Sequence, residues 1–190
     1  MCGGRGTRLD ASTEKPLHEI RGRSLVDRVL DALAASRLDD VYAVTSPHTP
    51  DTRRYLENRW GDSIIDAPGD GYVEDLQYAL DALDVDEASP VLTVAADLPL
   101  LAGDATDRVL DVYDTGSLTV CTPAALAEAL DVSTDAAFRL DGRRVVPSGV
   151  NVVGGDPDET WVTWDARFAV NVNYARDAAV AERLLSGPPE

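Results

Sequence analysis

Residues 24–45, SLVDRVLDALAASRLDDVYAVT, decide the fold class because they join a helix-like segment to a strand-like one. Within residues 24–36 the apolar side chains recur three and four positions apart, which predicts a helix with one buried stripe. Residues 41–45 form a short β-rich run. A helix of about a dozen residues beside a short buried strand is the repeating unit of a mainly parallel sheet covered by helices.

The same alternation continues along the chain. Further helices are predicted at residues 72–83, 106–113, 124–130 and 175–185. Further strands are predicted at residues 63–65, 91–95, 118–121, 150–153 and within 160–172. The pair Asp141-Gly142 inside residues 138–146 predicts a late hairpin. We therefore expect an α/β fold, a single three-layer Rossmann-like domain over residues 1–190 with a mainly parallel central sheet.

Composition excludes several classes of function. The chain has 190 residues, of which 44% are hydrophobic, enough to build a core. With 34 acidic and 17 basic residues its net charge is −17, which argues against a nucleic-acid partner and against docking on anionic membranes. No apolar run has the length of a membrane span and no signal-peptide pattern is present, so we expect a cytoplasmic protein with no membrane insertion. Cys2 and Cys121 form neither a disulfide framework nor a zinc motif.

The choice of charged residues is unusual. Aspartate outnumbers glutamate 25 to 9, and 16 of the 17 basic residues are arginine. Such usage is typical of halophilic proteins, because molar salt screens charges within a few ångströms and self-repulsion then costs little. Lys15 is the only lysine. A chain that otherwise uses arginine has kept one compact ammonium group there, which makes Lys15 a candidate functional residue.

A glycine-rich loop opens the chain. Residues 3–8, GGRGTR, are followed by residues 14–17, EKPL. The glycines allow a tight turn whose amide groups converge on an anion, while Arg5, Arg8 and Lys15 add positive charge suited to phosphate oxygens. The spacing fits neither a Walker loop nor a dinucleotide fingerprint. Such a loop normally follows a buried strand, whereas here it begins at Cys2, so we expect the first strand to be truncated.

A second candidate residue follows a predicted strand. Residues 91–97, VLTVAAD, read as a buried strand that ends in the carboxylate of Asp97. Ligands of open α/β sheets bind at the carboxyl ends of strands, and Mg²⁺ takes one or two carboxylates together with substrate phosphates. The alternative is a helix-capping or turn aspartate, which an aspartate-rich chain produces often.

Together, GGRGTR and EKPL resemble the signature of nucleotidyltransferases that act on the α-phosphate of a nucleoside triphosphate. Residues 45–50 (TSPHTP), 69–76 (GDGYVEDL) and 146–153 (VPSGVNVV) extend the resemblance over nearly the whole chain, to the archaeal GTP:adenosylcobinamide-phosphate guanylyltransferases. The resemblance implies a nucleotidyltransferase fold and transfer of GMP from GTP to adenosylcobinamide phosphate, with pyrophosphate as second product and Mg²⁺ as cofactor. That reaction belongs to cobalamin assembly and salvage.

The resemblance also implies roles for individual residues. Lys15, Arg8 and Asp97 would be catalytic, Asp97 and Asn173 would hold the metal, and Gly149 and Asn151 would contact the acceptor. The residues implied in nucleotide binding are Gly3, Gly4, Arg5, Gly6, Thr7, Arg8, Lys15, Ser46, Thr49, Gly71, Glu74, Asp75 and Asp97.

Several of these residues also have simpler interpretations. Ser46 and Thr49 present hydroxyls to a guanine edge or belong to a plain turn. Glu74 and Asp75 accept hydrogen bonds from guanine or complement a helix dipole.

Alternative functions stay open at this point. Another nucleotidyltransferase, such as a molybdenum-cofactor guanylyltransferase or a sugar-phosphate enzyme, shares the N-terminal signature. A catalytically inactive GTP-binding regulatory protein would also keep a nucleotide loop. Trp161 and Trp164 are interpreted as core residues or as a contact in a homodimer.

Overall fold

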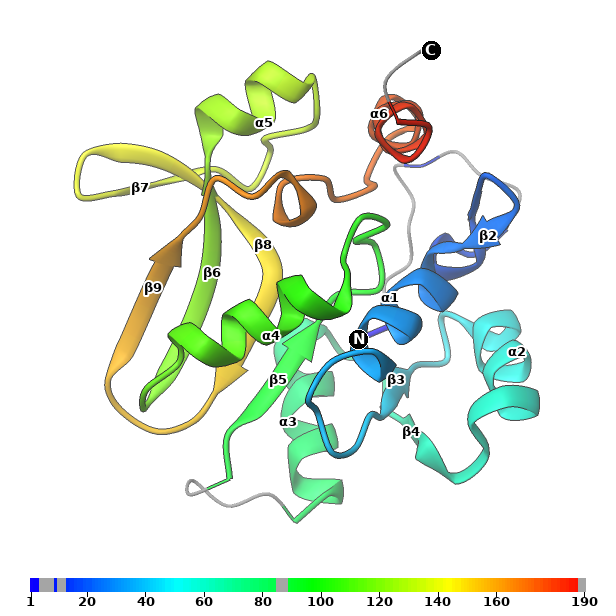
Figure 1. Cartoon of the computed structure of the whole chain (residues 1–190). Coiled ribbons are helices and arrows are strands. Elements are labelled where there is room, and N and C mark those ends of the chain that lie inside the picture. Colours follow the sequence, from blue (N-terminus) through cyan, green and yellow to red (C-terminus); the bar gives the residue numbers. More distant parts are fainter. Residues whose placement is uncertain (4–8, 10–12, 85–88, 188–190) are drawn as a thin grey trace.

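The computed structural model describes residues 1–3, 9, 13–84 and 89–187, and the rest of the chain is drawn in grey in Figure 1. Six α-helices lie in this part: α1 (Leu25–Ala34), α2 (Pro50–Trp60), α3 (Tyr72–Ala82), α4 (Gly103–Val112), α5 (Ala124–Leu130) and α6 (Ala175–Leu185). Three short 3-10 helices accompany them: η1 (Lys15–Leu17), η2 (Gly61–Ser63) and η3 (Ala166–Phe168). The strands are β1 (Glu19–Ile20), β2 (Arg23–Ser24), β3 (Ala43–Thr45), β4 (Ile64–Asp66), β5 (Val91–Val94), β6 (Ser117–Pro123), β7 (Phe138–Leu140), β8 (Arg143–Val153) and β9 (Asp158–Val162).

The first two residues join two parts of the central sheet. β3 pairs with β4 in parallel, and a separate set of strands has the order β5-β8-β6-β9. The backbone nitrogen of Met1 donates to Val94 O at 2.8 Å, and Ala96 N donates to Met1 O at 3.2 Å. On the other side, Cys2 N donates to Val44 O at 2.8 Å. Met1 and Cys2 therefore take the place of a strand between β3 and β5.

The mainly parallel central sheet expected from the sequence is confirmed, and β8 is the strand of its described part that runs in the opposite direction. Outside it, β1 and β2 form a small antiparallel pair. β8 pairs antiparallel with β5 and with β6, whereas β6 and β9 pair in parallel. β7 and β8 form the predicted late hairpin across Asp141 and Gly142, both of which have positive φ angles, 47° and 79°. Figure 1 shows β6, β8 and β9 side by side on one flank of the molecule, with β3 and β4 on the other.

Helices cover both faces of the sheet, as a three-layer fold requires. Met1 packs with Val44 of β3 and Ala79 of α3, whereas Cys2 packs on the opposite face with Val26 of α1 and Leu56 of α2. Neighbouring residues of a strand point to opposite faces, so Met1 and Cys2 anchor the two outer layers. None of the helices in the described part of the chain combines the length and apolar content needed to cross a bilayer.

Two local predictions from the sequence were wrong or incomplete. Helix α2 was not predicted, because its segment PDTRRYLENRW buries only Thr52 and Leu56 and so carries no apolar stripe. The β-rich segment 160–172 contains only the end of β9, since the chain turns into η3 after Val162. The Asp165 side chain caps that turn by accepting from Arg167 N at 2.9 Å.

Candidate active site

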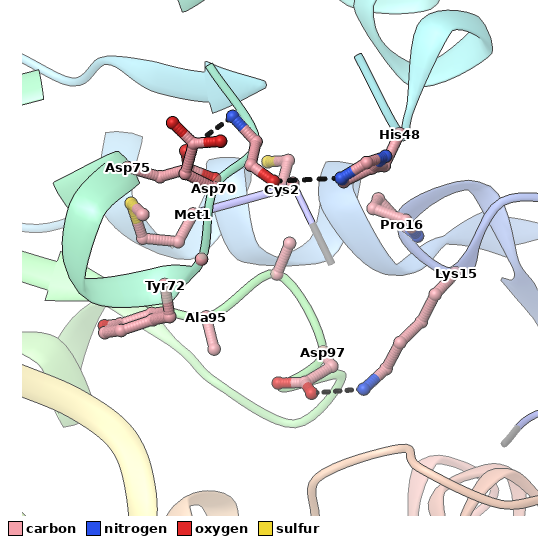
Figure 2. A pocket seen from close by; sticks show the side chains of 14 residues that line it. Met1, Cys2, Lys15, Pro16, His48, Asp70, Tyr72, Asp75, Ala95 and Asp97 are labelled. Carbon is pink, nitrogen blue, oxygen red and sulfur yellow. Dashed lines mark hydrogen bonds and ion pairs between the residues drawn. The ribbon is translucent and has the colours of Figure 1, made fainter. Parts of the chain in front are cut away.

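The carboxyl ends of β3, β4 and β5 lead into one pocket of about 470 Å³. It is lined by the N-terminal residues, by the segment around Lys15, and by the loops that follow the three strands. Figure 2 shows Lys15 and Asp97 together at one end of this pocket, and His48, Asp70 and Asp75 towards the other. Sites at strand carboxyl ends are the usual ligand sites of open α/β sheets.

Lys15, Asp97 and Asn173 meet at the first end, although they are far apart in the chain. Lys15 Nζ donates to Asp97 Oδ2 at 2.6 Å and to Asn173 Oδ1 at 2.8 Å. The side chains of Lys15 and Asp97 are 15% and 18% exposed, so the pair is largely shielded but open to a ligand. An ammonium group has three N–H donors. Two are used by these described partners, which leaves one for a ligand oxygen.

The segment that carries Asn173 is held by a buried carboxylate. Val172 N donates to Asp97 O at 3.0 Å, which sets this segment beside Asp97. The fully buried Asp177, in the first turn of α6, accepts from Asn173 N at 3.0 Å and Tyr174 N at 2.9 Å. It also accepts from the backbone and hydroxyl of Ser133. Sequence reasoning missed Asp177; its signal was a carboxylate near the start of a predicted helix, just after the asparagines.

The residues at this end fit a divalent cation. Asp97 Oδ1 is buried and has no hydrogen-bond partner among the described residues, and the same holds for Asn171 Oδ1. Carboxylate and amide oxygens are the ligands that Mg²⁺ prefers. No cluster of three His, Cys, Asp or Glu side chains suited to a metal occurs in the described ranges. A cation here would thus need a ligand's oxygens as well, as Mg²⁺ does with nucleotide phosphates.

Asp75 and Gly69 shape the second end. Asp75 is 5% exposed, and its Oδ1 accepts from Gly69 N at 2.7 Å. Gly69 O lies 3.0 Å from His48 Nε2; because a carbonyl oxygen only accepts, Nε2 carries the proton. Gly69 has a φ of +85°, and a Cβ there would lie 3.1 Å from His48 Nε2, so glycine suits this turn. Glu74 is exposed and does not line the pocket.

Several residues assigned from the sequence do not line the pocket. The Ser46 hydroxyl donates to Gly3 O at 3.0 Å and so joins this loop to the N-terminal segment, whereas the Thr49 hydroxyl donates to Ser46 O at 3.4 Å within the loop. Asn151 lies in the central strand β8 between Thr93 and Thr119.

The glycines that the sequence assigned to the site differ in where they lie. Gly149 allows β8 to approach β5, since a Cβ there would lie 2.9 Å from Ala95 Cβ. Gly3 and Gly71 do line the pocket. The assignments of Gly4, Arg5, Gly6, Thr7 and Arg8 lie outside the described residues.

Neither cysteine is a nucleophile in the folded state. Burial raises the pKa of the Cys121 thiol to about 11, and burial also raises the pKa of Cys2. Both thiols therefore stay protonated at pH 8 and lack the reactive thiolate. We expect the native protein to resist iodoacetamide at pH 8 and the unfolded protein to take up two alkyl groups, as measured by intact mass. Rapid alkylation of one cysteine in the native state would contradict this prediction.

The sheet, the pocket at its strand ends and the lysine–aspartate pair define an α/β protein of the nucleotide-binding class. Residues 1–141 match the family described as the MobA-like NTP transferase domain, so the chain belongs to the MobA-like NTP transferases. It is also 32% identical, over 97% of its length and 95% of the relative's, to adenosylcobinamide-phosphate guanylyltransferase of Methanocaldococcus jannaschii. The family resemblance seen in the sequence is thereby confirmed.

Two further matches have lower sequence identity. The bifunctional protein GlmU of Kineococcus radiotolerans is 29% identical over 66% of this chain, which spans 26% of that protein. A Bacillus anthracis structure, assigned as a glucose-1-phosphate thymidylyltransferase and solved with sucrose, has a TM-score of 0.68 at 11% identity. That alignment covers 100% of this chain and 94% of the other, and at such low identity it supports the fold alone.

Proposed function

We propose that this protein transfers GMP from GTP to adenosylcobinamide phosphate, forming adenosylcobinamide-GDP and releasing pyrophosphate. The observation that carries the proposal is the likeness to the Methanocaldococcus jannaschii guanylyltransferase along almost the full length of both chains. The pocket supports it, because it has a buried carboxylate at one end and a lysine–aspartate pair at the other. We further propose that residues 1–190 act as one domain, since Met1 and Cys2 make the central sheet continuous.

The two ends of the pocket suggest the orientation of GTP. The Asp75 carboxylate would accept hydrogen bonds from the N1 and N2 groups of guanine, which adenine cannot supply in the same way. Lys15 would donate to the α-phosphate. Among the described lining residues, Lys15 is the one lysine or arginine. Gly3 to Gly6, with Thr7, Arg5 and Arg8, would hold the rest of the triphosphate, as the sequence predicts.

The reaction needs no general base from the protein. A phosphate monoester has a second pKa near 6, so the acceptor is mostly a dianion at neutral pH. Its oxygen would attack the α-phosphorus, the bond from that phosphorus to the bridging oxygen of the β-phosphate would break, and pyrophosphate would leave with the electron pair. Catalysis then depends on bringing two anions together and stabilising the developing charge, for which Lys15 is placed.

Mg²⁺ would supply further positive charge to the phosphates when bound. Asp97 Oδ1 would hold it, because Asp97 Oδ2 is already bonded to Lys15. Asn173 Oδ1 also accepts from Lys15, whereas Asn171 Oδ1 is unpaired among the described residues. Asn173, the residue that the sequence favoured, is the asparagine held beside Asp97 through Lys15, and Asn171 is a second candidate because its oxygen is still available.

A homodimer is part of the proposal. Trp161 packs against Phe168 in the core with ring centroids 6.0 Å apart. Trp164 is 67% exposed and is the tryptophan that a contact between two copies would use.

The test is pyrophosphate release in molar KCl with Mg²⁺, comparing GTP with ATP in the presence and absence of adenosylcobinamide phosphate. We expect release with GTP only, and only with the acceptor. Release with a sugar 1-phosphate or a molybdopterin acceptor instead would assign the chain to a different nucleotidyltransferase. GTP binding without release for any acceptor would favour the regulatory protein.

Replacing Asp75 tests guanine recognition. A hydrogen bond to a charged group is worth about 1.5–3 kcal/mol, so Asp75→Asn should lower kcat/KM for GTP about ten- to a hundredfold. The value for ATP should hardly change, because adenine does not use these bonds. Glu74→Gln is the matched control, since Glu74 precedes Asp75 but is exposed. A loss of GTP preference in Glu74→Gln alone would reverse the assignment.

A further inference from the structure

Glu14 precedes Lys15 directly and makes an unusual pair of contacts. Its Oε1 accepts from Asp51 N at 2.9 Å, and its Oε2 accepts from Thr52 N at 2.7 Å. Both donors lie in the first turn of α2, 37 and 38 residues further along the chain. A single carboxylate thus binds two adjacent backbone amides of a distant helix.

Helix α2 needs such a partner. The first N–H groups of a helix have no acceptor within it, and a capping side chain usually satisfies one of them. The N-cap residue Thr49 makes no side-chain cap, and Pro50 at the first position has no N–H. The amides of Asp51 and Thr52 are left for Glu14, whose negative charge also suits the positive end of the helix dipole.

The contact between Glu14 and α2 restrains the backbone of the neighbouring residue Lys15. Glu14 O accepts from Leu17 N at 2.9 Å, and Lys15 O accepts from His18 N at 3.1 Å, so the turn η1 is closed on itself. Among the described hydrogen bonds, those of the Glu14 carboxylate are the only side-chain bonds that join this turn to α2. A lysine side chain is flexible and loses much rotational freedom when it is held. Anchoring its backbone restricts where Nζ can reach.

Glu14 also connects the two ends of the pocket. Helix α2 follows the loop that carries His48, which contacts Gly69 at the Asp75 end. Through Glu14, the start of this helix is joined to the residue before Lys15 at the other end. The distance between the two ends is therefore held by one carboxylate as well as by the sheet.

We propose that Glu14 is a positioning residue that places Lys15 against Asp97 and Asn173 by binding the first turn of α2. The positioning stands on these contacts alone, whereas its catalytic consequence rests on the function proposed above. Nothing in the role requires Glu14 to touch a substrate, and it does not line the pocket.

The single lysine of the chain allows a direct test. Acylation with an amine-reactive acetyl ester, followed by cleavage at arginine, reports on Lys15 in the peptide 9–21, which holds no other amine. In the native protein Lys15 should react slowly, because its amine is bonded to Asp97 and Asn173. In Glu14→Ala we expect its acylation to become about tenfold faster, the ratio for a loss of about 1.4 kcal/mol. Glu14→Gln, which keeps one acceptor oxygen, should lie between the two.

Asp51→Ala is the matched control. Asp51 lies in the same first turn, and its exposed side chain pairs with Arg54 rather than with the Lys15 segment. Its removal weakens the start of α2 without cutting the Glu14 contact, since Glu14 binds the Asp51 backbone. We expect Lys15 acylation in this variant to stay within about twofold of the native rate. That change is well below the acceleration of about tenfold, or about 1.4 kcal/mol, expected for Glu14→Ala. Melting temperatures measured in parallel identify any variant that has simply unfolded.

Two results would overturn the proposal. One is equal Lys15 acylation in Glu14→Gln, Glu14→Ala and the native protein. The other is equal acceleration in Glu14→Ala and Asp51→Ala. With GTP and the acceptor, Glu14→Ala should lower kcat while KM for GTP changes less, because Lys15 is displaced but the Asp75 end of the pocket, which would hold guanine, is unchanged. If the native protein has no transferase activity, the proposed function fails, and the acylation rates still decide whether Glu14 positions Lys15.

Discussion

Lys15→Ala is expected to lower turnover about a hundredfold or more, as the loss of a single charge-stabilising group does in other enzymes. The physical reason is that the reaction gathers negative charge on the α-phosphoryl group and the leaving pyrophosphate. Lys15 is the one lysine or arginine among the described residues that line the pocket. The measurement is kcat with saturating GTP and acceptor in molar KCl.

The melting temperature of Lys15→Ala must be measured as well, so that a loss of catalysis is distinguished from a loss of folding. The lysine–aspartate pair is largely shielded, and removing one partner of a buried pair costs about 3–5 kcal/mol. Lys15→Arg keeps the charge but replaces a compact ammonium with a broad planar group, so we expect only partial recovery. Arg54→Ala, an exposed cation on α2, serves as the control and should be fully active. Near-normal turnover in Lys15→Ala would show that another group stabilises the transferred phosphoryl.

Asp97→Ala should cause a loss of similar size, about a hundredfold, through a different route. It removes the free oxygen Oδ1 that would hold Mg²⁺, together with the Oδ2 partner of Lys15. The distinguishing measurement is the Mg²⁺ dependence of pyrophosphate release. In Asp97→Asn, which keeps the shape and one neutral oxygen, half-maximal rate should require more Mg²⁺, and excess metal should restore part of the activity.

The Mg²⁺ dependence of Asp97→Asn distinguishes the two interpretations of Asp97, as a metal ligand or as a turn residue. Asp158→Asn, in the exposed part of β9, is the control for removing one carboxylate from a strongly acidic chain. It should leave both turnover and Mg²⁺ dependence unchanged. If Asp97→Asn lowered the melting temperature but kept the native Mg²⁺ dependence, the turn interpretation of Asp97 would be the correct one.

The sequence alone was sufficient for the fold class, and it singled out Lys15 and Asp97 as candidate site residues. Apolar spacing along residues 24–36 and 91–95 reports directly on helix and strand, because a buried face must follow the period of its element. Lys15 stood out because no other lysine occurs, and Asp97 because it directly follows a buried strand. Helix α2 was not predicted from the sequence, because its buried face is too small to produce a periodic apolar pattern.

Tertiary structure alone decided which of the candidate residues lie together. Lys15 meets partners 82 and 158 residues away, and spacing along a chain carries no information on such contacts. The neighbours Glu74 and Asp75 look equivalent in sequence, yet helix geometry turns one to solvent and the other into the pocket. Glu14 has no signature of its own and Asp177 only that of a carboxylate near a helix start, since the amides that each binds depend on where two segments are packed. Periodicity is a local property and can be read from the chain, whereas these contacts exist only once the layers have assembled.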